Sequence, residues 1–337
     1  AALMIAVLPL LGPIGQPQQV VDIVGPYWVA MAVWIIPFTM FFVLKGLFDA
    51  TGRAWVGVAL SYLAVLVNVP ANYSFIHILD LGILGAGLAS ILSQTTALIA
   101  ALIYWRIAPS MAPYRAPSRI RRARVMAQAR EGLPLCIGYA GEGGAYAFIG
   151  IMIGWLGATP LAAHQVAHAI AGLAYVIPLG MAGAVSIRIG NAVGAETRER
   201  LRAILLAGLA IVTLWQSLVA LTFILGGPAI AAALSQDAAV ITLASALLLV
   251  LALMQVIDGV QSTSLGALRG LMDNRAPTAI TLLAYWPAAL PAAYLVGFVL
   301  GQGAVGVWLG YTVGIAIAAI ALPWRFWRRT RVTPAPH

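Results

Sequence analysis

Two carboxyl groups stand deep inside long apolar stretches of this 337-residue sequence. Glu142 is twelve residues after Arg130, and Asp258 is eleven residues before Arg269. A helix rises about 1.5 Å per residue, so both carboxyl groups would lie roughly 17 Å from a basic residue at a helix end. An ionisable group at that depth in a bilayer usually faces a cavity or a partner and serves a pathway. Two carboxyl groups at one depth can share a cavity and hold a proton, Na⁺ or an organic cation, one excluding another. The alternative is that each is a neutral, hydrogen-bonded structural group.

Polar and aromatic residues accompany both acids. Gln255 and Gln261 lie three residues before and after Asp258, and Ser262 follows, which predicts a polar stripe along the wall of a wet cavity. Tyr139 and Tyr146 lie within about one turn of Glu142. Their rings could offer π faces to a cation, although ordinary packing explains them equally well.

Four further polar residues come in pairs one helical turn apart. Asn68 and Asn72 either bridge two helices or line a cavity in the N-terminal part of the chain. His164 and His168 have the spacing of a two-histidine metal face, but the sequence offers no third ligand, so we predict hydrogen-bonded packing. We therefore predict no metal centre, apart from Na⁺ as an ion that Glu142 and Asp258 could hold.

The elements that must position these residues are membrane-spanning helices. Hydrophobic residues make up 62% of the sequence and charged residues 9%, against about 25% charged in an ordinary soluble domain. A bilayer-spanning helix needs about 20 apolar residues. Nine such stretches are predicted, and residues 1–14 are expected to be the tail of a further helix. The nine cover residues 27–48, 54–78, 82–105, 132–156, 160–187, 203–226, 238–268, 277–300 and 304–324.

The basic residues predict the orientation of these spans. All 19 Lys and Arg residues fall in alternate loops, near residue 50 and at 106–131, 188–202 and 269–275, and at the C-terminal end. The positive-inside rule places these loops and the C-terminus in the cytoplasm. The net charge of +9 is therefore spread over loops rather than gathered for nucleic acid, which we exclude as a partner. Membrane lipids are expected partners, with the arginine-rich segment 106–131 touching anionic headgroups.

An internal repeat organises the chain into two halves. Residues 45–49 (KGLFD) resemble 269–273 (RGLMD), and five residues from Pro70 to Leu88 match others 221 positions later. An even number of helices separates the copies, so the halves run parallel. We predict an N-terminal lobe at 1–105, a cytoplasmic linker at 106–131, a C-terminal lobe at 132–325 and a cytoplasmic tail at 326–337. The repeat also implies that about 90 residues precede Ala1 in a complete first lobe.

With these residues in view, the chain resembles the multidrug and toxic compound extrusion (MATE) family, most closely its bacterial NorM-like branch. The matching stretches run in order through essentially the whole chain. They are Gly132-Leu133-Pro134, Glu142, Gly154-Trp155-Leu156-Gly157, Ala163-His164-Gln165, residues 188–195 (RIGNAVGA), Gln255, Asp258 and Gln261, residues 266–270 (GALRG) and residues 306–310 (GVWLG).

The resemblance implies a fold and a function. The fold would be all-α and polytopic, with two parallel six-helix lobes, of which nine complete helices and a partial one are present here. Members export cationic or amphipathic drugs by alternating access in exchange for Na⁺ or H⁺, without a cofactor, and this chain would act as a monomer in a bacterial inner membrane. Glu142 and Asp258 fall on the acidic positions of the family's seventh and tenth helices, which are linked to cation coupling. The family's first helix is absent here, which leaves the coupling ion open.

Two rival functions make different demands on the sequence. A flippase for lipid-linked saccharides belongs to a related group with parallel six-helix halves, but it would favour a basic cavity, and no Lys or Arg lies deep in a predicted span. An intramembrane aspartyl protease would need two membrane aspartates and a Gly-x-Gly-Asp motif, which the sequence lacks. We therefore expect a transporter rather than an enzyme.

Overall fold

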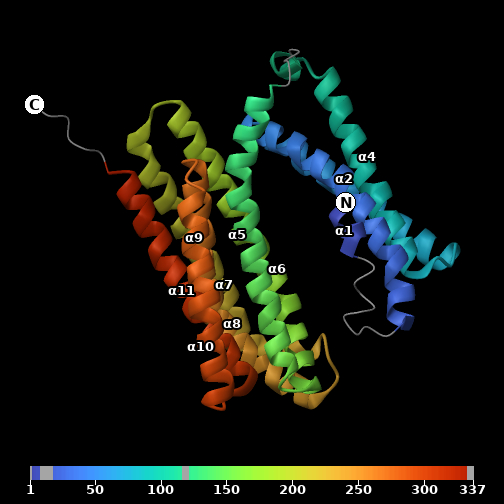
Figure 1. Ribbon diagram of the computed structural model, residues 1–337, viewed down its shortest axis with the longest axis vertical. Helices are drawn as coiled ribbons and strands as arrows, with labels where there is room; N and C mark the ends of the chain where they lie inside the picture. The colour runs from blue at the N-terminus through green and yellow to red at the C-terminus, as the bar shows by residue number, and fades with distance from the viewer. Residues whose placement is uncertain (1, 8–17, 116–120, 332–337) are drawn as a thin grey trace, which may run out of the picture. The chain divides into compact units, whose positions relative to one another are not determined.

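The computed structural model describes residues 2–7, 18–115 and 121–331, and most of these residues lie in helices (Figure 1). The chain divides into two compact units, residues 1–119 and 120–337, each of which has its own buried core. The units are described separately below.

In the first unit, the described residues form three long helices and three short elements. Its elements are α1 (Ala2–Val7), α2 (Gln18–Ala50), α3 (Ala54–Tyr73), the π-helix η2 (Ser74–Ile78), α4 (Gly82–Ile107) and the 3₁₀ helix η3 (Pro109–Arg115). Helix α4 packs against both α2 and α3. Phe48 and Met111 are fully buried in the core between these elements, together with alanines of α4.

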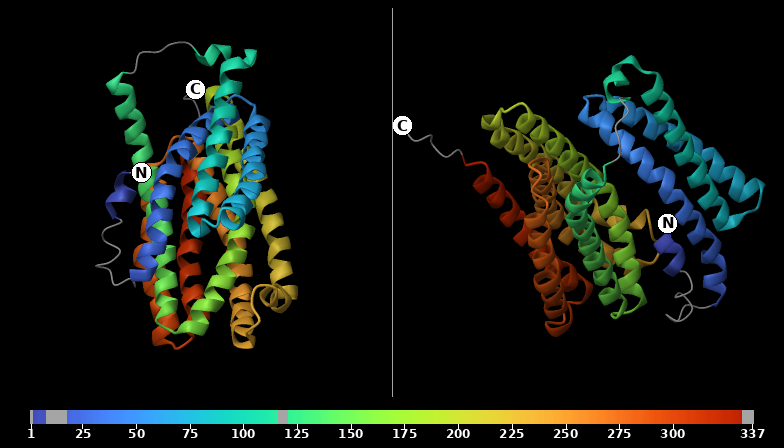
Figure 2. Two further views of the ribbon diagram at one scale, coloured as in Figure 1. Left: turned by 90° about the vertical axis from the view of Figure 1, so that its right-hand side faces the viewer. Right: turned by 45° about the horizontal axis from the view of Figure 1, so that its top comes forward.

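Within its described residues, the second unit contains six long helical segments, one of them interrupted by π-helical turns. Figure 2 gives two further views of these helices. Its elements are α5 (Arg122–Gly154), α6 (Ala158–Gly194), η4 (Arg198–Arg200), α7 (Leu201–Ala232), α8 (Ala238–Gly270), α9 (Arg275–Ala284), η5 (Tyr285–Ala289), α10 (Leu290–Tyr294), η6 (Leu295–Val299) and α11 (Gly303–Arg329). Pro287 lies inside η5, and because proline has no backbone N–H, it cannot make the regular α-helical bond at that turn.

Helix α8 lies at the centre of the second unit, packed against α6, α7 and α11. Close approach to α6 depends on two glycines one turn apart. A side chain at Gly266 would collide with the backbone of Ala182, and one at Gly270 would collide with the backbone oxygen of Ser186. Small residues four apart let two membrane helices pack backbone to backbone, which explains why α8 can be covered on so many sides.

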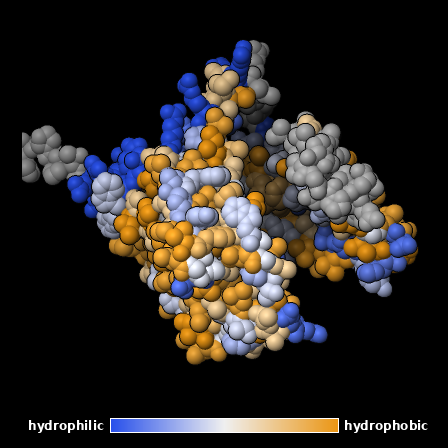
Figure 3. Space-filling view, turned by 60° about the horizontal axis from the view of Figure 1, so that its bottom comes forward, coloured by the Kyte–Doolittle hydropathy of each residue, from blue (hydrophilic) through white to orange (hydrophobic). Residues whose placement is uncertain are grey.

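The outer surface of the second unit suits lipid tails. On α7, one face buries Val212, Gln216 and Phe223, while Leu214 and Leu225 on the other are exposed. Figure 3 shows hydrophobic side chains over most of the visible surface of this unit. Exposed apolar area on this scale would be a liability in water but is expected against hydrocarbon.

The structure confirms the nine predicted spans and corrects several of their ends. Nine helices within the described residues are long and apolar enough to cross a bilayer. Helix α5 begins at Arg122, so the later part of the predicted 106–131 linker is helical, and α6 runs to Gly194, so Arg188 is helical rather than in a loop. Helix α11 continues to Arg329, so the predicted tail from 326 begins inside a helix.

These ends were missed because an apolar count stops at the edge of the hydrocarbon layer. A helix can continue into the aqueous interface, where long basic side chains reach water. Of the predicted fragment 1–14, the structure describes α1, and the remainder lies outside the described residues.

Element boundaries confirm the internal repeat. Three pairs of elements begin 221 residues apart: α3 and α9 at Ala54 and Arg275, η2 and η6 at Ser74 and Leu295, and α4 and α11 at Gly82 and Gly303. The packing repeats as well. The backbone of Phe75 lies against Gly85 in the first unit, and that of Val296 lies against Gly306 in the second. The repeat therefore holds for geometry as well as for residue identities.

The α6–α8 contact gives a stability prediction. Replacing Gly266 with alanine should destabilise the protein by about 1–3 kcal/mol, because the added methyl group must push α8 away from Ala182. The measurement is thermal unfolding of the purified protein in detergent. Gly180→Ala on α6 is the matched control, because nothing lies within 4 Å of a side chain there, and it should leave the midpoint unchanged or raise it slightly. Equal midpoints for the two variants would contradict the proposed packing constraint.

Candidate functional site

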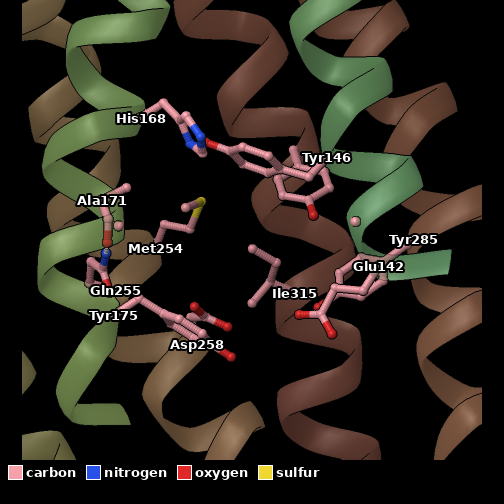
Figure 4. A pocket seen from close by; sticks show the side chains of 13 residues that line it. Glu142, Tyr146, His168, Ala171, Tyr175, Met254, Gln255, Asp258, Tyr285 and Ile315 are labelled. Carbon is pink, nitrogen blue, oxygen red and sulfur yellow. Dashed lines mark hydrogen bonds between the residues drawn. The ribbon is translucent and has the colours of Figure 1, made fainter. Parts of the chain in front are cut away.

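The second unit contains a cavity of about 250 Å³, which we call the carboxylate cavity. Side chains from α5, α6, α8, η5 and α11 form its wall. The lining residues are Glu142, Gly143, Tyr146, His168, Ala171, Gly172, Tyr175, Met254, Gln255, Asp258, Tyr285, Tyr311 and Ile315. Figure 4 shows the carboxyl groups of Glu142 and Asp258 directed into the same space from α5 and α8. The structure therefore brings together the two acids that the sequence singles out.

The carboxyl groups of Glu142 and Asp258 have no bonding partner among the described residues of the protein. Glu142 and Asp258 are half-buried, and within the described part of the chain neither makes a side-chain hydrogen bond or an ion pair. A purely structural buried acid would be expected to have such partners. The absence of such partners favours the interpretation that both carboxyl groups serve a ligand entering the cavity, a role that stays a prediction.

Four tyrosines from four elements surround the acids. Tyr146 comes from α5, Tyr175 from α6, Tyr285 from η5 and Tyr311 from α11. The ring of Tyr311 stacks on that of Tyr285, with centroids 5.7 Å apart, and meets that of Tyr146 edge-on at 5.8 Å. The rings therefore support one another, and Figure 4 shows Tyr175 beside Asp258.

Gln255 and Gln261 have different surroundings, although both flank Asp258 on α8. Gln255 lines the cavity, where its side-chain oxygen accepts a 2.6 Å hydrogen bond from Gln216 of α7 and its amide donates to the carbonyl of Ala171. Gln261 is buried outside the cavity lining and donates to the hydroxyl of Tyr285. The predicted polar stripe is thus divided: one glutamine borders the cavity, and the other holds one of its tyrosines.

Tyr139, Asn68 and Asn72 are not among the residues that line the carboxylate cavity. Tyr139 is more than half exposed, and its hydroxyl accepts a 2.6 Å hydrogen bond from Arg269. Asn68 and Asn72 belong to the first unit, where Asn72 donates to Asn68 and Asn68 donates to Ser93 of α4. The pair therefore bridges α3 and α4, and its role as the lining of a cavity in the N-terminal part of the chain stays a prediction.

The two histidines of α6 are engaged in hydrogen bonds. The indole N–H of Trp308 donates to Nδ1 of His164, and Nδ1 of His168 lies 3.0 Å from the hydroxyl of Tyr146. Within the described residues, no group of three or more His, Cys, Asp or Glu side chains could hold a metal ion. The hydrogen-bonded interpretation of this pair agrees with the geometry.

Sequence reasoning missed Tyr175, Tyr285, Tyr311 and Gln216. A tyrosine in an apolar span is a weak indication of a binding cavity, because tyrosines are also common where a helix crosses the lipid–water interface. Tyr175 carried a usable signal, since it lies seven residues after His168 and hence on the same face of α6. Gln216 carried another, as an amide inside an apolar span must find a partner.

Two carboxyl groups and several π faces in one small cavity suit an organic cation. The carboxylates supply charge, and the rings supply cation–π attraction and apolar contact without requiring one fixed shape. A bare metal ion would use only the carboxylates.

Comparisons with known proteins show which family this chain resembles. Residues 134–295 match the family model MatE. "Probable multidrug resistance protein NorM" of Xylella fastidiosa (strain 9a5c) is 33% identical over 86% of this chain and 64% of its own length, so the chain spans under two thirds of that relative. The protein of the same name from Pseudomonas aeruginosa is 34% identical over 97% of this chain and 70% of its own length.

A solved structure shows the same fold. The crystal structure of a mutant of the Vibrio cholerae MATE transporter VcmN superposes with a TM-score of 0.88. That alignment covers 97% of this chain and 75% of the other, at 20% sequence identity.

The ring of tyrosines gives a binding prediction. Tyr175→Leu should weaken equilibrium binding of the fluorescent cation ethidium by about tenfold, because the π face beside Asp258 is lost, whereas Tyr175→Phe should bind nearly as well as the original. Fluorescence polarisation with the purified protein measures both. Tyr294→Leu is the control, because Tyr294 is exposed and lies outside the cavity lining. Equal binding by the Tyr175→Leu and Tyr175→Phe variants would exclude a role for the ring.

Proposed function

We propose an export function from one premise: this chain belongs to the MATE family of multidrug and toxic compound extrusion transporters. It is a multi-pass membrane protein with the MATE fold. On this basis, we propose that the protein carrying this chain exports cationic or amphipathic drugs across a bacterial inner membrane, in exchange for Na⁺ or H⁺.

The observation that carries this proposal is that one cavity is lined by two carboxyl groups, neither of which makes an ion pair within the described residues. Glu142 and Asp258 offer negative charge to a space of about 250 Å³, large enough for only part of a drug-sized molecule within this unit. A proton or Na⁺ on these oxygens removes the charge that an organic cation requires. Drug and coupling ion therefore exclude one another, and mutual exclusion at one site is the basis of antiport.

The residues around the acids have distinct roles in this proposal. Tyr146, Tyr175, Tyr285 and Tyr311 provide the surface against which drugs of different shapes pack. Gln255, held by Gln216 and the Ala171 carbonyl, contributes a fixed polar wall beside Asp258. No cofactor is required, because ion exchange supplies the driving force, and we propose that a monomer suffices.

The alternatives fit the cavity less well. A flippase for lipid-linked saccharides must accommodate phosphate, yet the lining of the carboxylate cavity includes no Lys or Arg and presents two acids. An aspartyl protease needs two aspartates, and this cavity has one. We propose further that the basic loops and the C-terminus face the cytoplasm, following the positive-inside rule.

Replacing the acids tests the function. Glu142→Gln or Asp258→Asn, made in the complete protein, should abolish ethidium export driven by an imposed Na⁺ or proton gradient, because the amide cannot hold the coupling ion. The measurement is dye efflux from cells or proteoliposomes, with membrane insertion checked by immunoblotting of membranes. Glu199→Gln is the matched control: Glu199 is exposed in η4 and has no ion pair in the described structure. Normal efflux by both cavity variants would remove the proposed mechanism.

A further inference from the structure

Arg269 belongs to the last turn of α8, and it shares a small cavity with Glu142, which also lines the carboxylate cavity. Its Nη1 donates a 2.6 Å hydrogen bond to the hydroxyl of Tyr139, and its guanidinium carbon lies 4.5 Å from the centroid of that ring. Tyr139 and Glu142 are three residues apart on α5 and hence neighbours on one helix face. The guanidinium therefore rests on the residue adjacent to Glu142.

A second, much smaller cavity connects the two charged groups. Glu142 and Arg269 both line it, together with Gly138 and Thr278 among others, and its volume is about 10 Å³, which is room for roughly one water molecule. The Nε atom of Arg269 is buried and has no hydrogen-bond partner within the described structure. A buried donor without a partner is costly, so this arginine has a reason to move toward an acceptor.

The internal repeat shows that Arg269 has a different partner from its counterpart in the first unit. Its counterpart in the first unit is Lys45, which makes a 2.7 Å ion pair with Asp49. Asp273 is the counterpart of Asp49, but it is already bound by Arg325 of α11 through two hydrogen bonds of 2.7 and 3.1 Å.

Arg329 adds a third bond to the same carboxylate, at 3.3 Å. Asp273 therefore has little capacity for another arginine. Within the described residues, Arg269 makes no salt bridge. The guanidinium of Arg269 is therefore not neutralised by Asp273, the counterpart of the aspartate that pairs with Lys45. It lies near Glu142, which has no ion pair within the described residues either.

We propose that Arg269 is a positioning residue that drives release of the coupling cation, by moving from Tyr139 to Glu142 and displacing the ion held there. This inference rests on the proposed function. One carboxylate cannot fully neutralise two cations, so a guanidinium arriving at Glu142 weakens the hold on Na⁺ or H⁺. Tyr139 is the resting place to which the guanidinium returns when an ion occupies Glu142.

The proposal predicts effects of opposite sign for two neighbouring substitutions. Arg269→Gln removes the competitor, so the concentration of coupling ion needed for half-maximal exchange should fall by about tenfold, the size of one charge-assisted hydrogen bond. The maximal rate should fall as well, because release is slowed. Tyr139→Phe removes the hydroxyl that holds Arg269 away from Glu142, so the half-saturating ion concentration should rise.

The experiment measures ethidium exchange by the complete protein in proteoliposomes. Na⁺ is varied at fixed pH and, separately, pH is varied without Na⁺, and the half-saturation point and maximal rate are read from whichever ion supports exchange. Arg269→Lys should restore part of the original behaviour. Arg275→Gln is the matched control, because it removes the same charge from an exposed residue at the start of α9.

The outcomes separate this inference from the proposed function. No ion-driven exchange by the unmodified protein would remove the proposed function itself. Normal exchange by the unmodified protein, with Arg269→Gln and Tyr139→Phe shifting half-saturation in the same direction or not at all, would overturn the role of Arg269 alone. A merely structural role would lower the maximal rate in both variants without shifting half-saturation in opposite directions.

Discussion

Carboxyl groups inside a bilayer need water, a cation, a proton or hydrogen-bond donors of the protein, because hydrocarbon does not stabilise an ionised oxygen. The second unit meets this requirement with a cavity instead of fixed ion pairs. Glu142 and Asp258 face that cavity without protein partners in the described structure. The site is thereby left dependent on whatever cation enters, which is the property that a cation exchanger needs.

The packing around α8 follows from the same requirement. To hold Asp258 at a fixed depth, α8 is covered by α6, α7 and α11, and Gly266 and Gly270 allow the close approach of α6. Two polar groups near the acids are held by hydrogen bonds from residues outside the cavity lining: Gln216 donates to Gln255, and Gln261 donates to Tyr285. These bonds hold Gln255 and Tyr285 in place in the cavity wall, while the two carboxyl groups have no protein partner within the described residues.

Sequence predicted the large features because they are set by simple periodicities. Apolar length gave the nine spans, and the repeat anticipated element boundaries that agree to the residue in the second half of each unit. Depth along a helix predicted that Glu142 and Asp258 could meet. Rotation about the helix axis was harder to predict. It separates Gln261 from the cavity and brings in Tyr175 and Tyr311, and it depends on packing between helices far apart in the sequence.

Competition at the carboxylate cavity is the most direct test of this account. Equilibrium binding of ethidium to the purified complete protein should be measured at increasing Na⁺, and at falling pH without Na⁺. The account predicts that the apparent Kd rises in proportion to the concentration of the coupling ion, without reaching a plateau, because one site cannot hold both. A Kd that levels off would show that drug and ion bind at the same time, and a Kd that does not change with either ion would show that they bind at independent sites. Either result would contradict mutual exclusion.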